Sequence, residues 1–121
     1  MTINNPGLYM AGVWDWALLD GCFGETKIKP TDIDGFVERN GRFLILETKA
    51  PGASIPQGQF ITFQQLVRRA GAMVIVIWGT NNKVEHIKVF TGLHINGIDE
   101  DADNERLKQV VSAWFAKAND R

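Results

Sequence analysis

The dipeptide Asn40-Gly41, set between two apolar segments, constrains the fold of this chain more than any other feature. Asn-Gly favours the two-residue turns that join antiparallel strands, because both positions need a positive φ angle. The segments on either side, 31–38 and 42–49, have the composition of strands. We therefore expect a tight β-hairpin in which Arg39 lies opposite Arg42.

This register predicts which side chains meet across the hairpin. Asp34 falls opposite Glu47, and Asp32 falls opposite Lys49. Side chains alternate between the two faces of a strand, so these four groups are expected on one face. The opposite face receives apolar residues, namely Ile33, Val37, Leu44 and Leu46.

Three carboxylates on one face require a compensating cation. Like charges opposed across strands cost about 0.2–1 kcal/mol, and more when they are desolvated. Lys49 supplies one positive charge. We expect a hard divalent ion, Mg²⁺ or Mn²⁺, to supply the remainder, since such ions bind carboxylates, carbonyls and water.

The rest of the chain alternates between helical and strand patterns. Apolar spacing predicts helices over 8–19, 56–70 and 103–118, a doubly buried strand over 72–78 and an edge strand over 84–90. A helix between two strands of one sheet implies a parallel pair with a right-handed crossover. The sequence therefore predicts an α/β domain with a mixed central sheet and helices on its faces.

Composition limits the function classes. The chain has 121 residues, 45% of them hydrophobic, and a formal net charge of −1, which suits one folded domain and gives no sign of a general nucleic-acid or membrane binder. It has one cysteine and no long apolar run. We therefore expect a cytoplasmic protein without a membrane anchor.

Several motifs carry a resemblance to a known family. Asp34, then Glu47-Thr48-Lys49 at the end of an apolar strand, then a glutamine-bearing helix and a buried strand, resemble the PD-(D/E)xK nuclease superfamily. Within it, the chain resembles the small phage and bacterial members related to RecB-like, VRR-NUC and Holliday-junction-resolvase nucleases. The resemblance implies one restriction-endonuclease-like domain over residues 1–121.

The resemblance also implies roles for individual residues. Asp34 and Glu47 would hold the metal ion, with the backbone carbonyl of Thr48 as a further ligand. Lys49 would orient the attacking water or stabilise charge on the phosphate. Gln59 would match the glutamine of the Q-x-x-x-Y helix motif, although Phe63 replaces the tyrosine.

Some assignments stay open at this point. Gln57 and Gln64 compete with Gln59 for the glutamine position, and Asp32 competes with Asp34 for the first acid. Members of the family often place an additional acid on the first helix. Asp15 and Asp20 are the candidates here, and their alternative is a surface or capping role.

Other polar residues receive simpler interpretations. Asp99, Asp101 and Asp103 resemble a calcium loop, but Asn104 and Val110 occupy positions that need Gly and Glu, so we interpret the three as acids before a helix. His86 is expected to be an ordinary strand residue. The chain also has four tryptophans that could stack on bases, and core positions are expected for Trp14, Trp78 and Trp114.

The sequence thus predicts a Mg²⁺-dependent deoxyribonuclease that hydrolyses phosphodiester bonds. Structure-directed cutting, homodimer formation or delivery by a protein partner is expected rather than sequence-specific restriction. The candidate phosphate contacts are Lys27, Lys29, Arg68 and Arg69. One alternative is a nuclease-fold binding or inhibitory module of phage or prophage origin without catalysis. Another is a domain whose hairpin acids are only surface charges.

Overall fold

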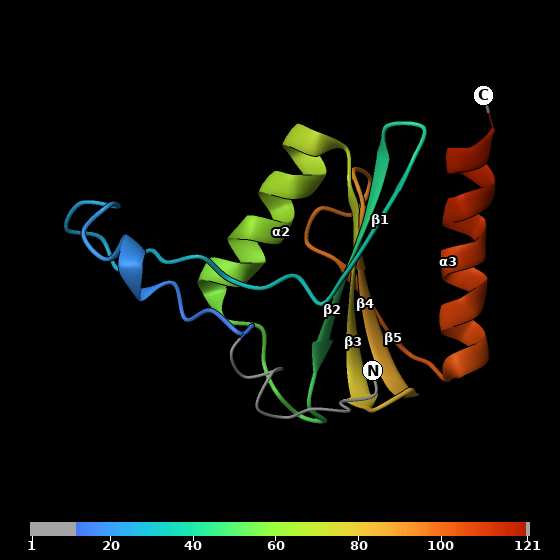
Figure 1. Cartoon of the computed structure of the whole chain (residues 1–121). Helices are drawn as coiled ribbons and strands as arrows, with labels where there is room; N and C mark the ends of the chain where they lie inside the picture. Colours follow the sequence, from blue (N-terminus) through green and yellow to red (C-terminus); the bar gives the residue numbers. More distant parts are fainter. Residues whose placement is uncertain (1–11, 121) are drawn as a thin grey trace. The chain divides into compact units, whose positions relative to one another are not determined.

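The computed structural model describes residues 12–120. The chain divides into two compact units, Met1–Asp32 and Ile33–Arg121. Figure 1 shows the second unit as a β-sheet with a helix on each face. Within residues 12–120, no helix is long and apolar enough to cross a lipid bilayer.

The N-terminal unit contains much less helix than its apolar spacing predicts. Its one helix among the described residues is the 3₁₀ turn η1, Ala17–Leu19, and residues 8–11 of the predicted helix lie outside the described range. Trp16 adopts a left-handed conformation with φ of 64°, directly before this turn. Helices this short are marginal without tertiary packing, and no residue of η1 is buried. The prediction of a helix over 8–19 is therefore wrong for residues 12–16.

The hairpin forms as predicted. β1, Gly35–Arg39, pairs with β2, Arg42–Lys49, and Arg39 lies opposite Arg42. Asn40 and Gly41 both have positive φ, 52° and 80°, as the expected turn requires. However, the pairing starts at Gly35, so residues 31–34 of the predicted strand precede the ladder.

The parallel pair joined by a helix is also confirmed. α2, Gln57–Ala70, connects β2 to β3, Met73–Thr80, and the two strands are parallel. Gly71 ends the helix in a left-handed conformation, φ 66°, which glycine adopts at little cost. β3 is the central strand of the sheet, and Val74, Ile75 and Val76 are fully buried.

The edge of the sheet differs from the prediction. β4, Lys83–Phe90, pairs with β3 on one side and with β5, Ile98–Asp101, on the other, so β4 is not an edge strand. The strand order is β1-β2-β3-β4-β5, with every neighbouring pair antiparallel except β2 and β3. The chain then enters α3, Asn104–Asn119, whose N-cap is Asp103.

Each helix covers one face of this sheet (Figure 1). On the α2 face, Ile45, Val74 and Val76 of the sheet form one buried cluster with Phe63 and Val67 of the helix. On the α3 face, a second cluster joins Leu44, Ile75 and Ile87 to Trp114 and Ala118. Alternate residues of β2 therefore point to different helices, which decides where its last residues point.

The hairpin turn also contacts the end of α3. Arg42 Nη1 donates to the Lys117 carbonyl at 2.8 Å, and the Asn40 side chain donates to the Ala118 carbonyl at 2.9 Å. The last carbonyls of a helix lack partners within the helix, and positive charge near them is favourable. These bonds hold the hairpin against α3 and so fix the start of β2.

Candidate functional site

The candidate site lies at the end of β2, on the face covered by α2. Phe43 and Ile45 pack in the cluster under α2, so Glu47 and Lys49 continue on that face. Both side chains are half-buried. The alternation predicted for Glu47 and Lys49 is thus confirmed by the packing of the preceding residues.

Asp34 reaches this site from before β1 rather than from within it. Its Oδ2 atom accepts a hydrogen bond from the Thr48 backbone N–H at 2.8 Å and another from the Thr48 hydroxyl at 3.0 Å. The backbone pairing of β1 with β2 ends at Gly35, and the side chain of Asp34 continues the connection to β2 beyond that point. The Asp34 carboxylate also lies close enough to Glu47 to raise the pKa of that residue, so the structure brings the two predicted acids together.

The electrostatics of Glu47 reflect this crowding. Burial raises the pKa of Glu47 above its ordinary value of 4.5, and the charge of Asp34 and its hydrogen bond raise it further. Lys49 and a hydrogen bond with Gln59 act in the opposite direction, but the pKa stays raised. The ionised form of Glu47 is therefore less stable here than in water, and an approaching cation would stabilise it.

Gln59 joins the site from the first turns of α2. Its side chain lies close enough to Glu47 to lower the pKa of that carboxyl, which distinguishes Gln59 from Gln57 and Gln64. Gln64 instead donates to Asn96 at 3.0 Å. The Oε1 atom of Gln59 is buried and has no hydrogen-bond partner among the described residues. A buried oxygen without a partner costs about 1–3 kcal/mol, so this atom needs a ligand or a water molecule.

The donor set fits a magnesium-type ion. Two carboxylates and an amide oxygen are hard oxygen ligands, and Mg²⁺ commonly takes one or two carboxylates and keeps several waters. No group of three or more His, Cys, Asp or Glu side chains placed to hold a metal occurs in residues 12–120. Soft metals that require a complete cage of nitrogen and sulfur ligands do not suit this site.

The remaining predicted acids belong to the N-terminal unit. Asp15 Oδ1 accepts a hydrogen bond from the Ala17 backbone N–H at 2.9 Å, which is a local structural role at the start of η1. Asp20 lines a pocket within this unit. Asp32 precedes β1 and so does not pair with Lys49 through the ladder. A part for any of the three in the metal site stays a prediction.

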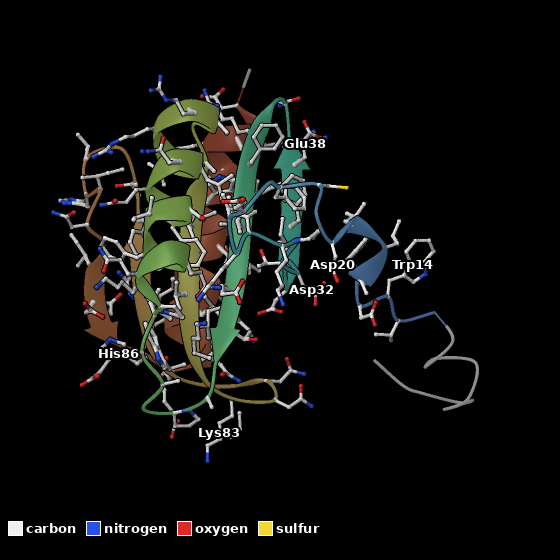
Figure 2. The ribbon with its side chains drawn as sticks, turned by 90° about the vertical axis from the view of Figure 1, so that its left-hand side faces the viewer. Trp14, Asp20, Asp32, Glu38, Lys83 and His86 are labelled. Carbon is white, nitrogen blue, oxygen red and sulfur yellow. The ribbon has the colours of Figure 1, made fainter. Side chains whose placement is uncertain are left out.

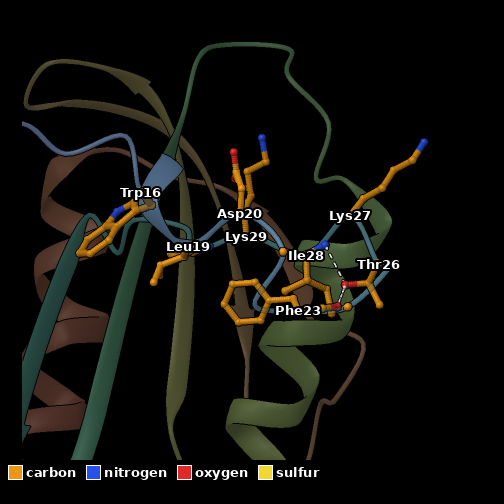
Figure 3. A pocket seen from close by; sticks show the side chains of 11 residues that line it. Trp16, Leu19, Asp20, Phe23, Thr26, Lys27, Ile28 and Lys29 are labelled. Atoms are coloured by element: carbon orange, nitrogen blue, oxygen red, sulfur yellow. Dashed lines mark hydrogen bonds between the residues drawn. The ribbon is translucent and has the colours of Figure 1, made fainter.

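The four predicted phosphate contacts lie in two places. Lys27 and Lys29 line a pocket of about 520 Å³ in the N-terminal unit, together with Trp16, Phe23 and Ile28, as Figure 3 shows. Arg68 and Arg69 are exposed in the last turn of α2. Arg68 lies roughly 13 Å beyond Gln59 along the helix axis. Any phosphate it contacts is therefore remote from Glu47.

The sequence interpretation missed a second polar cluster, on the same face. His86 Nε2 lies 2.9 Å from Asp99 Oδ1, and His86 Nδ1 lies 2.9 Å from Asp101 Oδ1. Asp99 and Asp101 are strand residues rather than acids before a helix, so that interpretation is corrected. The hydrogen bonds with Asp99 and Asp101 raise the pKa of His86 above 6.5.

The strand register aligns the two clusters. Lys49, Trp78, His86 and Asp101 are successive partners across β2, β3, β4 and β5. The neighbouring row consists of Glu47, Val76, Lys88 and Asp99. The polar residues thus gather at one end of the α2 face. Ligands of open α/β sheets bind beyond the carboxyl ends of the strands, and β2 and β3 end here.

Together these features define a small α/β protein with a five-stranded mixed sheet, two helices and a carboxylate pair at the end of a parallel strand. Comparisons with protein-family models, with curated proteins and with solved structures found no match for this chain.

Proposed function

We propose that the chain is a metal-dependent nuclease that hydrolyses DNA phosphodiester bonds. The observation that carries the proposal is the pair of Asp34 and half-buried Glu47 beside the unpartnered Gln59 Oε1, where burial first and the charge of Asp34 second raise the Glu47 pKa. Such a pair is poorly placed as a purely structural feature. A hard divalent ion would remove the repulsion and satisfy the amide oxygen at once.

The architecture supports the same class of enzyme. An antiparallel hairpin, a crossover helix and a parallel central strand follow one another here, which is the order expected of a restriction-endonuclease-like domain. The resemblance to that family places the second metal-binding acid and the lysine at the end of an apolar strand, as Glu47 and Lys49 are on β2. We infer that Glu47, Thr48 and Lys49 are the corresponding residues.

Each residue has a definite task in this proposal. Asp34 and Glu47 hold the ion, with the Thr48 carbonyl and Gln59 Oε1 as further oxygens. Thr48 fixes the orientation of Asp34 through its two hydrogen bonds. A bound Mg²⁺ supplies Lewis acidity toward water and the phosphate oxygens.

Lys49 acts on the substrate. It lies on the same face as Glu47, two residues further along β2, and its charge already lowers the Glu47 pKa. From this position the ammonium group orients the attacking water and neutralises charge on the phosphate in the transition state. Removal of one such electrostatic contact costs about 100- to 1000-fold in rate.

A cleavage assay tests the proposal. Purified protein is incubated with single-stranded, branched and supercoiled plasmid DNA in Mg²⁺ or Mn²⁺, together with Glu47→Gln and Lys49→Met. Both variants should lose at least about 100-fold in rate. Glu105→Gln and Lys108→Met are matched controls, because these residues form an exposed ion pair on α3.

The assay also separates the alternative functions. Cleavage that both active-site variants retain would contradict the proposal. Metal binding that Glu47→Gln abolishes, without cleavage of any substrate, would instead favour a binding or inhibitory module.

A further inference from the structure

A second pocket lies next to the candidate site, one strand beyond Lys49. It has a volume of about 300 Å³ and is lined by the loop residues 51–53 and by Trp78, Glu85, His86 and Asp99. Trp78 is the direct strand partner of Lys49, so its backbone is about 4.8 Å away. Figure 2 shows His86 at this end of the sheet, beside the loop that leads into α2.

An irregularity in the strand pairing forms one side of the pocket. Trp78 pairs with His86 and Gly79 pairs with Val84, so Glu85 has no partner on β3. A side chain at Gly79 would overlap the Lys83 carbonyl oxygen, so this close approach requires glycine. Bulges redirect side chains, and here two consecutive residues, Glu85 and His86, line the same pocket.

The aromatic wall of the pocket is held in place. Trp78 Nε1 donates to the Ala53 carbonyl at 2.6 Å, which ties the indole to the loop. The His86 ring meets the indole nearly edge-on, with ring centroids 5.3 Å apart. The two hydrogen bonds of His86 with Asp99 and Asp101 fix the imidazole in turn. A preformed aromatic surface loses little entropy when a flat ligand stacks on it.

The two carboxylates of the pocket differ in whether they can accept a hydrogen bond from a ligand. Asp99 already uses both oxygens, one with His86 and the other with Lys88 Nζ at 3.3 Å. The Glu85 carboxylate forms no hydrogen bond or ion pair with any residue in the described part of the chain. The pocket thus presents an available carboxylate, which can only accept hydrogen bonds.

This chemistry selects a flat ligand with N–H donors on one edge. The acids around the pocket disfavour a phosphate, which leaves a nucleobase as the part of a DNA strand that fits. Guanine has two adjacent donors, N1–H and N2–H, that match the two oxygens of a carboxylate. Thymine has one N–H between two carbonyl oxygens, which a carboxylate would repel.

We propose that the pocket binds an unpaired guanine of the DNA strand that is cut beside Glu47 and Lys49. The base must be unpaired, because a stacked base within a duplex cannot enter a pocket of this kind. The inference rests on the proposed nuclease function for its position on the strand. Binding of the base in this pocket directs cleavage to single-stranded or branched DNA, next to guanine.

Binding in EDTA tests the pocket separately from catalysis. Fluorescence anisotropy compares three single-stranded oligonucleotides, a heptathymidylate and the same strand with a central guanine or a central inosine. The guanine strand should bind about tenfold more tightly than heptathymidylate. Inosine lacks the N2 amino group and should fall between the two.

Two variants and one control make the test specific. Glu85→Gln should remove most of the guanine preference, and Trp78→Leu should weaken binding of all three strands by about fivefold or more. Glu105→Gln, on α3, should change neither. Equal affinity of the wild type for guanine and thymine strands, or a guanine preference that survives in Glu85→Gln, would overturn the pocket assignment.

The outcomes for the two proposals are distinguishable. Mg²⁺-dependent cleavage without guanine preference would overturn the base pocket and leave the nuclease function in place. A guanine preference in EDTA, without cleavage of any substrate in Mg²⁺, would overturn the placement of the base beside a scissile phosphate.

Discussion

Thr48 donates both its backbone N–H and its hydroxyl to Oδ2 of Asp34, at 2.8 and 3.0 Å. These bonds attach the segment before β1 to the end of β2, beyond the last paired residue of the hairpin. They also hold the Asp34 carboxylate next to Glu47, where it raises the Glu47 pKa. These two hydrogen bonds thus create the acidic pair on which the proposed metal site depends.

Asp34→Asn should lower the pKa of Glu47 toward its ordinary value of 4.5. The amide keeps an oxygen for the Thr48 bonds but removes the negative charge that disfavours ionised Glu47. An NMR titration of the Glu47 carboxyl signal in EDTA measures the shift. Asp101→Asn, at β5, is the control, and an unchanged Glu47 pKa in Asp34→Asn would show that the two acids do not interact.

Glu47→Gln should stabilise the metal-free protein at about pH 7, by about 0.5 kcal/mol. A folded-state pKa raised above 4.5 means that Glu47 favours folding at low pH and that this contribution is lost as pH rises through the raised pKa. The neutral amide removes the repulsion. Urea unfolding in EDTA measures the difference, and Glu105→Gln should show no gain. A loss of stability in Glu47→Gln at this pH would contradict the account.

His86 should make the stability depend on pH in the neutral range. Its pKa is raised by Asp99 and Asp101, so the stabilisation is complete below 6.5 and is lost as pH rises through the raised value. The groups are solvent-accessible, so the loss should be below about 1 kcal/mol. Thermal unfolding measured across this range should show a flatter profile for His86→Asn than for the wild type. An equal dependence of stability on pH in the two proteins would contradict the stabilising hydrogen bonds of His86 with Asp99 and Asp101.

Asp99 of the same cluster should make the stability depend on pH in the acidic range. Although burial raises the pKa of Asp99, hydrogen bonds from His86 and Lys88 outweigh it and hold the pKa below 3.8. The ionised carboxylate therefore stabilises the fold above 3.8, and this contribution is lost as pH falls through the lowered pKa. Asp99→Asn should reduce the loss of stability in acid, measured by urea unfolding, and Asp120→Asn provides the comparison.

Arg42→Met should destabilise the protein by about 1 kcal/mol, because the Lys117 carbonyl at the end of α3 loses its donor. Methionine preserves the apolar stem of the side chain. Arg69→Met, in the last turn of α2, is the comparison, since no hydrogen bond of its side chain is seen among the described residues. Equal unfolding free energies for the two variants would show that the bond with α3 contributes nothing.

Local signals predicted most of the sheet. The Asn40-Gly41 turn gave the correct register, and β2 has the predicted bounds because apolar residues fill it from Phe43 to Leu46. α2 and β3 follow their periodicity in the same way. The strand β5 was not predicted from the sequence. Its residues, Ile-Asp-Glu-Asp, have no strand pattern of their own and form a strand only by pairing with β4.

The two polar sites likewise differ in whether a local sequence signal predicts them. Asp34 and Glu47 were found because extrapolated hairpin register brings them together, even though the actual link runs through Thr48. The cluster around His86 depends on the pairing of β4 with β5. This pairing brings His86 to Asp99 and Asp101, which are 13 and 15 residues further along the chain, and no local pattern predicts it. The one available signal was that His86 and Lys88 repeat the spacing of Asp99 and Asp101.

The location of a bound paramagnetic ion shows whether Asp34, Glu47 and Gln59 form a metal site. Substoichiometric Mn²⁺ is added to isotope-labelled protein, and the broadening of each backbone amide signal is measured by NMR. The signals of Thr48 and Gln59 should broaden first, and Glu47→Gln should abolish this effect. Broadening centred on Asp99 and Asp101, or unchanged broadening at Thr48 in Glu47→Gln, would contradict this metal site.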